Sequence, residues 1–286
     1  MSGQPIGVFD SGIGGLSVLK ALRAAMPHED FIYIADSGHA PYGERDEAHV
    51  LARSRAIVQH LVRHNVKALV IACNTATAAA IHLLRDEHPT LALVGVEPAL
   101  KPAVALSQTG RIGVMATRST LASAKFQALL AAQSGGAKDV RFIVQPCDGL
   151  AHAIETSADS GDMARVAALC AQHTGAMGQF GMQAGQIDTL VLGCTHYPFA
   201  SEHLRALVGP QVHLIDNGQA IARQTQRLLR PSLECGLNAS VGAGQVRLFT
   251  TGQPPTLQAA ALRWLELAAG VGVLGADNSC SIYRET

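Results

Sequence analysis

The sequence has no excess of charge of either sign and no long apolar run. Its 286 residues contain 22 lysines and arginines and 22 aspartates and glutamates, so the formal net charge is zero. No basic or acidic run occurs, and the charge pattern therefore gives no support for a nucleic-acid partner or a membrane surface. No apolar stretch reaches the length of about 18 residues that a membrane span needs.

The N-terminal sequence also lacks the charged segment and apolar core of a signal peptide. Residues 1–5 lead directly into an apolar strand pattern, and we therefore expect a cytoplasmic protein. The six cysteines, at positions 73, 147, 170, 194, 235 and 280, form no Cys-x-x-Cys pair and no dense framework. In a reducing compartment most of them are expected to be free thiols.

What the sequence does contain is the alternation of apolar strands and amphipathic helices that is typical of an α/β fold. Hydrophobic residues make up 48% of the chain, enough for a full core. The pattern predicts parallel sheets covered by helices on both faces. Strands are expected at 6–10, 31–35, 68–72 and 91–96, and helices at 16–25, 47–64 and 76–87.

The strand pattern restarts in the second half of the chain. The segment from Arg111 to Thr117 resembles the segment from Pro5 to Ser11, at an offset of 106 positions. The segments ending at Cys73 and at Cys194 also match, at an offset of 121, so the second half carries 15 extra residues before its cysteine. Glycine-rich residues 175–185 are expected to hold some of them.

These matches predict two similar α/β lobes with the active site in the cleft between them. The first lobe is expected to comprise residues 1–98 together with 216–286, because the tail from about Asn217 is expected to return to it. The second lobe is expected to comprise residues 99–215.

Both Cys73 and Cys194 are expected at the carboxyl end of a strand, where open α/β sheets bind their ligands. Asn74 or Thr75 is expected to cap the helix after Cys73, and Thr195 with Pro198 to start the helix after Cys194. A helix N-terminus favours a thiolate. The alternative is that each cysteine is a small buried apolar residue. We expect only that ordinary role for Cys147, Cys170 and Cys235, since none ends a comparable strand.

The turn Asp10-Ser11-Gly12-Ile13-Gly14-Gly15 is not a phosphate-binding loop. It lacks both the Gly-x-Gly-x-x-Gly order and a Gly-Lys-Ser/Thr segment. Two interpretations remain: a simple strand-to-helix turn, or a cradle for a carboxylate with Asp10 and Ser11 directed at the ligand.

Four segments together resemble the signature segments of the glutamate racemases. They are DSGIGGL from Asp10, PYG from Pro41, ACNTAT from Ala72 and GCTHYP from Gly193, and they occur in that family's order. The resemblance extends over nearly the whole chain, to about Leu265. The segment 37–40 before Pro41 departs most from the family pattern, and the residues from about 270 match nothing known.

The resemblance implies an isomerase that interconverts L- and D-glutamate without pyridoxal phosphate or another cofactor and supplies D-glutamate for peptidoglycan synthesis. Cys73 would take the Cα proton from the D-enantiomer and Cys194 from the L-enantiomer. Asp10 and His196 would assist the thiols, although a histidine beside a cysteine is also explained by an ordinary polar contact. Glu155 resembles a family glutamate near the second thiol, and its alternative is a solvated helix carboxylate.

The resemblance also implies the groups that bind the substrate. The amino and α-carboxylate groups would be held by side chains and amides of the matched segments, and Thr117 and Thr120 would bond the side-chain carboxylate. The remaining residues of this set are Asp10, Ser11, Tyr42, Gly43, Asn74, Thr75, Thr195 and His196. Glutamate is the expected partner, a homodimer fits the family's habit of self-association, and no metal is expected.

Three alternatives stay open on the sequence. The first is a racemase of another amino acid, such as aspartate, or a related isomerase on the same scaffold. The second is a zinc site formed by Cys73, Cys194 and His196, although these give few ligands. The third is a binding module of two lobes without catalysis, which would have no need of two matched thiols.

Overall fold

The computed structural model describes residues 3–135, 139–234, 242–274 and 280–281. The chain divides into two compact units, one formed by Met1–Val96 with Gly218–Thr286 and the other by Glu97–Asn217. Each unit contains its own sheet and its own helices.

The first unit is built on a sheet with the strand order β11-β10-β9-β2-β1-β3-β4, parallel except for β11. The strands are β1 Ile6–Asp10, β2 Phe31–Ala35, β3 Ala68–Ile71, β4 Ala92–Gly95, β9 Val246–Thr250, β10 Val271–Leu274 and β11 Cys280–Ser281. Strands β1, β2 and β3 are buried at every residue, which explains why they are continuous apolar runs in the sequence.

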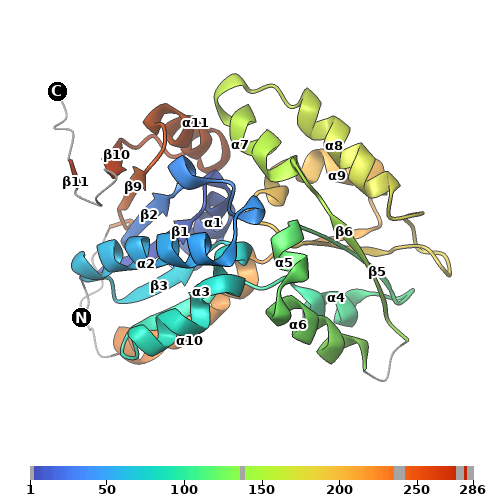
Figure 1. Ribbon diagram of the computed structural model, residues 1–286, viewed down its shortest axis with the longest axis horizontal. Coiled ribbons are helices and arrows are strands. Elements are labelled where there is room, and N and C mark those ends of the chain that lie inside the picture. The colour runs from blue at the N-terminus through green and yellow to red at the C-terminus, as the bar shows by residue number, and fades with distance from the viewer. Residues whose placement is uncertain (1–2, 136–138, 235–241, 275–279, 282–286) are drawn as a thin grey trace. The chain divides into compact units, whose positions relative to one another are not determined.

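Helices cover both faces of this sheet (Figure 1). Helices α2 and α3 pack on one face, where their apolar side chains form a core with β1, β2 and β3. Helices α1, α10 and α11 pack on the other face. Their bounds are α1 Leu16–Ala25, α2 Glu47–Arg63, α3 Asn74–Glu87, α10 Gly218–Glu234 and α11 Pro254–Leu265, with short 3₁₀ turns η1 Ile13–Gly15, η2 Ser37–His39 and η3 Tyr42–Glu44.

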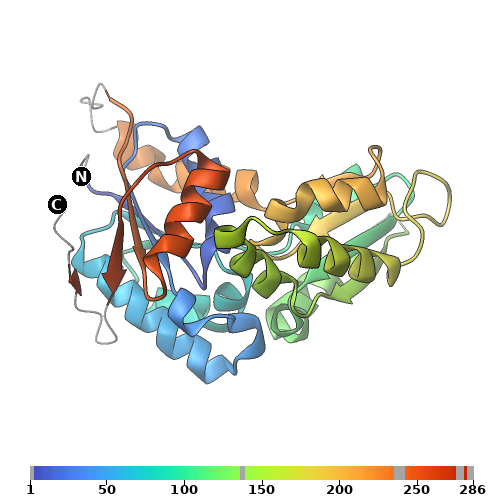
Figure 2. The ribbon, with the colours of Figure 1, turned by 90° about the horizontal axis from the view of Figure 1, so that it is seen from above.

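The second unit has a four-stranded parallel sheet with the order β6-β5-β7-β8. Its strands are β5 Arg111–Ala116, β6 Arg141–Pro146, β7 Thr189–Leu192 and β8 His213–Ile215. Helices α4, α5 and α6 pack on one face, while α7, α8 and α9 form the other layer, with α8 and α9 side by side (Figure 2). The bounds are α4 Leu100–Leu106, α5 Arg118–Ala122, α6 Ala124–Ser134, α7 Leu150–Ser160, α8 Ala164–Gly175, α9 Ser201–Val208 and the 3₁₀ turn η4 Tyr197–Ala200.

The two sheets share one strand order, because β2-β1-β3-β4 corresponds to β6-β5-β7-β8. The expected fold class, two similar parallel-sheet lobes with helices, is therefore confirmed. Paired positions also locate the extra residues of the second unit. Ile6 pairs with Ala68 and Ile112 pairs with Thr189, so the second interval is 15 residues longer. Ten of these residues lie between β6 and β7, since Phe31 and Phe142 mark the corresponding positions in β2 and β6.

The predicted elements of the first unit are close to the observed ones. The strands expected at 6–10 and 31–35 and the helix expected at 16–25 have the observed bounds. The strand expected at 68–72 is one residue shorter at its end, and the strand expected at 91–96 is one residue shorter at each end. Helix α3 begins at Asn74, two residues earlier than expected. None of the described helices combines the length and apolar character that crossing a membrane would require.

Candidate active site

The first thiol, Cys73, lies two residues beyond β3 at the start of α3. It is itself the N-cap of that helix: its sulfur accepts a hydrogen bond from the backbone amide of Ala76, with a nitrogen–sulfur distance of 3.4 Å. The expectation that Asn74 or Thr75 caps this helix is therefore wrong, because both residues are already inside its first turn. The sulfur lies at the partially positive end of the helix dipole and is 5% exposed.

Asp10 and Ser11 lie beside Cys73, because β1 and β3 are neighbours in the sheet. The Cys73 thiol is 3.6 Å from the Ser11 hydroxyl oxygen, and the Ser11 hydroxyl is 3.4 Å from the Asp10 Oδ1 atom. Asp10 is fully buried, and its Oδ2 atom accepts a hydrogen bond of 2.5 Å from the Gly15 amide. A β-carbon on Gly15 would lie 2.6 Å from the Asp10 β-carbon, so only glycine permits this bond. The turn thus fixes the carboxylate of Asp10.

Asn74 is buried without a hydrogen-bond partner. Its side chain is 4% exposed, and neither its amide nitrogen nor its carbonyl oxygen has a partner in the described part of the chain. A buried amide in this state costs roughly 1–3 kcal/mol per unpaired group. Its neighbour Thr75 is also buried. The two residues stand next to the Cys73 sulfur, so a bound molecule could supply the missing partners.

Tyr42 and Gly43 form the 3₁₀ turn η3 of the first unit. The Tyr42 side chain is 1% exposed, and its hydroxyl donates a hydrogen bond of 2.5 Å to Asp36. Burial, and then the negative charge of Asp36, raise the pKa of the Tyr42 phenol far above its usual range, so it stays protonated. Sequence reasoning missed Asp36, although an acidic residue that directly follows an apolar strand and precedes the Pro-Tyr-Gly segment is a signal that could have found it.

The second thiol, Cys194, lies two residues beyond β7, the strand that corresponds to β3. Thr195 and His196 follow it, and all three are buried. The next turn is the 3₁₀ turn η4, which His196 precedes without a side-chain capping bond, and α9 starts only at Ser201. The expectation that Thr195 starts the helix after Cys194 is therefore wrong. The first helical turn is η4, which begins at Tyr197, and Pro198 lies in that turn as expected.

Cys194, His196 and Glu155 form a hydrogen-bonded chain. The Cys194 sulfur is 3.8 Å from His196 Nδ1, and His196 Nε2 is 2.6 Å from Glu155 Oε2. Burial alone would lower the pKa of the His196 imidazole, but the hydrogen bonds with Cys194 and Glu155 raise it well above its ordinary value. Glu155, on α7, is only 15% exposed, so the alternative of a solvated helix carboxylate does not apply. The two hydrogen bonds thus favour the protonated form of the imidazole beside the sulfur.

Thr117 and Thr120 bond to each other at the end of β5. The Thr117 hydroxyl caps α5 by accepting a bond from the Thr120 amide, and it donates to the Thr120 hydroxyl oxygen over 2.9 Å. By strand register Thr117 corresponds to Ser11, and it follows the strand that lies next to β7. The structure therefore brings these two hydroxyls to the same edge of the sheet as Cys194.

Cys147 departs from expectation. It directly follows β6, so the statement that it ends no comparable strand is wrong. Burial and the nearby Cys194 raise the pKa of its thiol far above the usual range, which leaves it a neutral buried group. Burial raises the pKa of Cys170, on α8, to about 11. Both are free thiols, as expected, and Cys235 lies outside the described residues.

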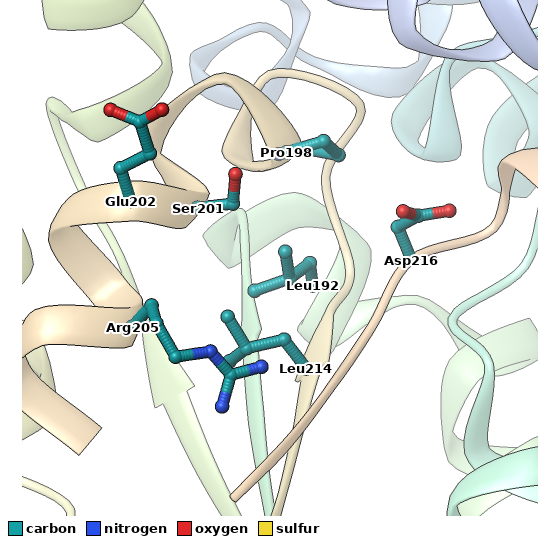
Figure 3. Close-up of a pocket in the computed structure, with 7 residues that line it drawn as sticks. All are labelled: Leu192, Pro198, Ser201, Glu202, Arg205, Leu214 and Asp216. Atoms are coloured by element: carbon teal, nitrogen blue, oxygen red, sulfur yellow. The ribbon is translucent and has the colours of Figure 1, made fainter. Parts of the chain in front are cut away.

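A pocket of about 380 Å³ lies in the second unit (Figure 3). Its walls come from β7, η4, α9, β8 and the residue that follows β8. They are formed by Leu192, Pro198, Ser201, Glu202, Arg205, Leu214 and Asp216. None of the candidate residues lines it, so the pocket is separate from the thiol. Within the described residues, no group of three or more His, Cys, Asp or Glu side chains is arranged to hold a metal ion.

Comparison with known proteins identifies the family. The family model described as Asp/Glu/Hydantoin racemase matches residues 14–225. A glutamate racemase of Ectopseudomonas mendocina is 47% identical over 90% of this chain and 93% of its own length. One of Herpetosiphon aurantiacus is 45% identical over 89% of this chain and 95% of its own. The chain belongs to the glutamate racemase family. It is accordingly an amino-acid racemase, an isomerase.

Solved glutamate racemases share the fold over both units. The structure from Bacillus anthracis superposes with a TM-score of 0.82 at 30% identity and covers 98% of this chain and 100% of its own. The Escherichia coli structure, a complex with L-glutamate and the activator UDP-MurNAc-Ala, gives a TM-score of 0.78 at 29% identity, covering 95% and 98%. The family's fold thus extends over nearly the whole chain.

Proposed function

We propose that this racemase interconverts L- and D-glutamate without a cofactor, by proton transfer between the substrate Cα and two thiols. The observation that carries the proposal is the matched position of Cys73 and Cys194. Each lies two residues beyond the corresponding strand of two sheets with the same strand order, and each is followed by helical turns. The relatives, all glutamate racemases, support the choice of substrate.

Two acid/base groups suit racemisation because the proton must leave one face of Cα and return to the other. A single rigidly held base serves one face only, whereas two groups can act in turn. In each direction one sulfur is a thiolate that removes the proton and the other is a thiol that supplies one. After turnover their protonation states are exchanged, and the reverse reaction starts from that state.

We assign proton removal from the D-enantiomer to Cys73. The family resemblance implies this assignment. Ser11 and Asp10 can assist Cys73, because the Ser11 hydroxyl lies between the Cys73 sulfur and the Asp10 carboxylate. A hydroxyl that contacts both can reorient toward a thiolate or toward a carboxylate as the charge on sulfur changes. The amide of Ala76 adds a fixed donor to the sulfur. Asp10 assists proton transfer by holding Ser11 and by its negative charge.

We assign proton removal from the L-enantiomer to Cys194, with His196 as its partner. The protonated imidazole can donate to the sulfur when the thiol has lost its proton, and the Glu155 carboxylate holds the ring in place. A carboxylate bonded to one ring nitrogen orients the other toward its target. Glu155 is thus a positioning residue for His196.

The Cα proton is far less acidic than a thiol with an ordinary pKa near 8.5, so the protein must stabilise the carbanion by fixed dipoles and by binding the carboxylate. The unpaired amide of Asn74 supports a substrate contact beside Cys73. We assign the same task to the remaining polar residues near the two thiols, with the side-chain carboxylate bound by Thr117 and Thr120. Those remaining residues are Ser11, Tyr42, Gly43, Thr75, Thr195 and His196.

D-glutamate formed in this reaction would serve peptidoglycan synthesis. The Escherichia coli relative is described with a UDP-linked muramic acid derivative as activator, and muramic acid is a peptidoglycan sugar. A link between a glutamate racemase and a cell-wall precursor supports the same setting for this protein.

The test is deuterium incorporation at Cα in deuterated water with no cofactor added. The purified protein should exchange the Cα proton of both glutamate enantiomers and racemise them. Cys73→Ser and Cys194→Ser should each lower racemisation by about two orders of magnitude or more, the usual range for losing an acid/base group. Cys170→Ser is the matched control, because it replaces a buried free thiol on α8 that belongs to neither proposed set of acid/base residues.

Near-normal turnover in either of the first two variants would contradict the two-thiol mechanism. A requirement for added pyridoxal phosphate would contradict cofactor independence. Loss of activity in Cys170→Ser equal to that in the other variants would show that the assay reports folding instead of chemistry.

A further inference from the structure

Asp36 is a buried acceptor that joins four parts of the first unit. It directly follows β2, its side chain is 0% exposed, and both of its oxygens are occupied. Oδ2 accepts from the Tyr42 hydroxyl at 2.5 Å and from Arg53 Nε at 3.0 Å. Oδ1 accepts from Arg53 Nη2 at 2.9 Å and from the Thr251 hydroxyl at 2.8 Å, and it lies 3.1 Å from His39 Nδ1.

Thr251 brings the C-terminal segment of the unit into this cluster. It follows β9, which pairs with β2, so its hydroxyl reaches a residue 215 positions earlier in the sequence. The same hydroxyl accepts from the Gly38 amide at 3.1 Å. A β-carbon on Gly38 would lie 2.5 Å from the Thr251 carbonyl oxygen, so the two segments are in direct contact. The loop of residues 37–43 is therefore fastened at Gly38 as well as at Tyr42.

The second unit has no such cluster at the corresponding position. Phe31 in β2 corresponds to Phe142 in β6 by strand register, and Asp36 therefore corresponds to Cys147, a neutral buried thiol. The strand order that the two units share therefore does not itself require a carboxylate at this position. The cluster around Asp36 is specific to the unit that carries Tyr42 and Gly43.

We propose that Asp36, Arg53 and Thr251 are positioning residues for substrate binding, and that they act by fixing the turn of Tyr42 and Gly43. The proposal rests on the assignment of Tyr42 and Gly43 as substrate contacts. The Asp36 carboxylate accepts the hydrogen bond of the Tyr42 hydroxyl and so fixes the Tyr42 side chain. Arg53 neutralises this buried carboxylate, and Thr251 fixes the start of the loop. The bonds that these three residues make within the described part of the chain involve neither thiol, so their loss should weaken substrate binding more than proton transfer.

The test compares Thr251→Val with Thr251→Ser. Valine has nearly the same shape as threonine but loses both hydrogen bonds, whereas serine keeps the hydroxyl. Thr251→Val should raise KM for both glutamate enantiomers by about tenfold or more, with kcat within about threefold of the unaltered protein, because uniform binding is lost. Thr251→Ser should restore KM to within about twofold.

Thr225→Val is the matched control. Thr225 is a fully buried threonine on α10 whose hydroxyl bonds the Ile221 carbonyl oxygen at 2.9 Å, away from the loop. Its replacement should leave KM unchanged. An equal rise of KM in Thr225→Val, or a fall of kcat with unchanged KM in Thr251→Val, would overturn the proposal.

Tyr42→Phe provides a second arm and decides the question if Thr251→Val does not fold. It removes only the hydroxyl that Asp36 holds, and it should raise KM by a similar factor. An unchanged KM in this variant would overturn the proposal. If the unaltered protein does not racemise glutamate, the proposed function fails. If it does and neither variant changes KM, only the positioning role fails.

Discussion

Replacing Glu155 with glutamine tests whether the hydrogen-bonded chain behind Cys194 serves the reaction. Glutamine keeps the length of the side chain and an oxygen that can accept from His196, but it removes the negative charge. The contact is short, at 2.6 Å, and both side chains are largely buried, at 7% and 15% exposure. Solvent therefore screens this pair less than it would a surface ion pair.

The magnitude follows from the difference between a charged and a neutral hydrogen bond. A bond to a charged group contributes roughly 1.5–3 kcal/mol and a neutral one roughly 0.5–1.5 kcal/mol. Glu155→Gln should thus remove about 1–2 kcal/mol from the protonated form of His196. Because the protonated imidazole loses the negative charge beside it, the pKa of His196 should fall. If the imidazolium stabilises the transition state, kcat/KM should fall by roughly five- to thirtyfold.

The direction of the pH effect follows from the raised pKa of His196. The protonated His196 persists to higher pH in the folded protein than in the unfolded chain. Its pairing with Glu155 therefore stabilises the fold fully below the ordinary histidine pKa and is lost as pH rises through the folded-state pKa. The difference in Tm between the parent protein and Glu155→Gln should be largest near pH 6 and shrink at alkaline pH. The alkaline limb of kcat/KM should move to lower pH in the variant.

Steady-state rates in both directions and thermal unfolding at several pH values provide the assay. Enantiomers have equal free energies in water, so kcat/KM must fall equally for L- and D-glutamate. Only the separate kcat and KM values can differ between directions. Glu202→Gln, at an exposed position on α9, is the control and should change neither rate nor pH profile. A Glu155→Gln variant with kcat/KM within twofold of the parent and an unmoved alkaline limb would refute the role assigned to Glu155.

Three further predictions concern binding and substrate choice. Asn74→Ala should keep or raise the Tm of the free protein, because it removes unpaired buried groups. Added glutamate should raise the Tm of this variant less than the Tm of the parent. A large fall in the Tm of the variant without glutamate would contradict the prediction. Asp10→Asn should lower turnover by roughly two to four orders of magnitude in a racemisation assay, whereas a raised KM at normal kcat would reassign Asp10 to binding. The kcat/KM for glutamate should exceed that for aspartate by at least about a hundredfold. Aspartate is one methylene shorter, and a displacement of the reacting carbon by about one ångström can lower the rate by that factor. Equal values of kcat/KM would show that the substrate assignment is wrong.

The sequence predicts the sheets well where strands are fully buried. Strands β1, β2 and β3 are covered on both faces, so each is an unbroken apolar run with a visible end. Strand β6 is an edge strand whose residues are exposed or only partly buried, so no apolar run in the sequence marks it or shows that Cys147 follows a strand. The visibility of a strand in the sequence thus depends on its place in the sheet.

The contacts of the candidate site are less predictable, because they join positions far apart in the chain. Glu155 meets His196 across 41 positions, and Asp36 meets Thr251 across 215. No local pattern specifies such pairs. The role of Cys73 as the N-cap of α3 is hard to predict for a different reason. A sulfur is a weak acceptor, and residues of the types that usually cap helices, Asn74 and Thr75, directly follow it.

A repeated fold accounts for two equivalent thiols but not for two equivalent halves of a site. By strand register Ser11 corresponds to Thr117, and Asp36 to Cys147. Cys73 therefore has a hydroxyl and a carboxylate beside it, whereas Cys194 has an imidazole backed by a carboxylate. In the proposed reaction a proton reaches the planar carbanion from one face or from the other. The same chemistry is needed on both faces, so two bases of the same kind suit it. The remaining groups of glutamate have no such symmetry, so each can be bound by one unit only. The two units therefore share the strand ends that carry the thiols and differ in the side chains beside them, as the binding of a ligand with dissimilar groups requires.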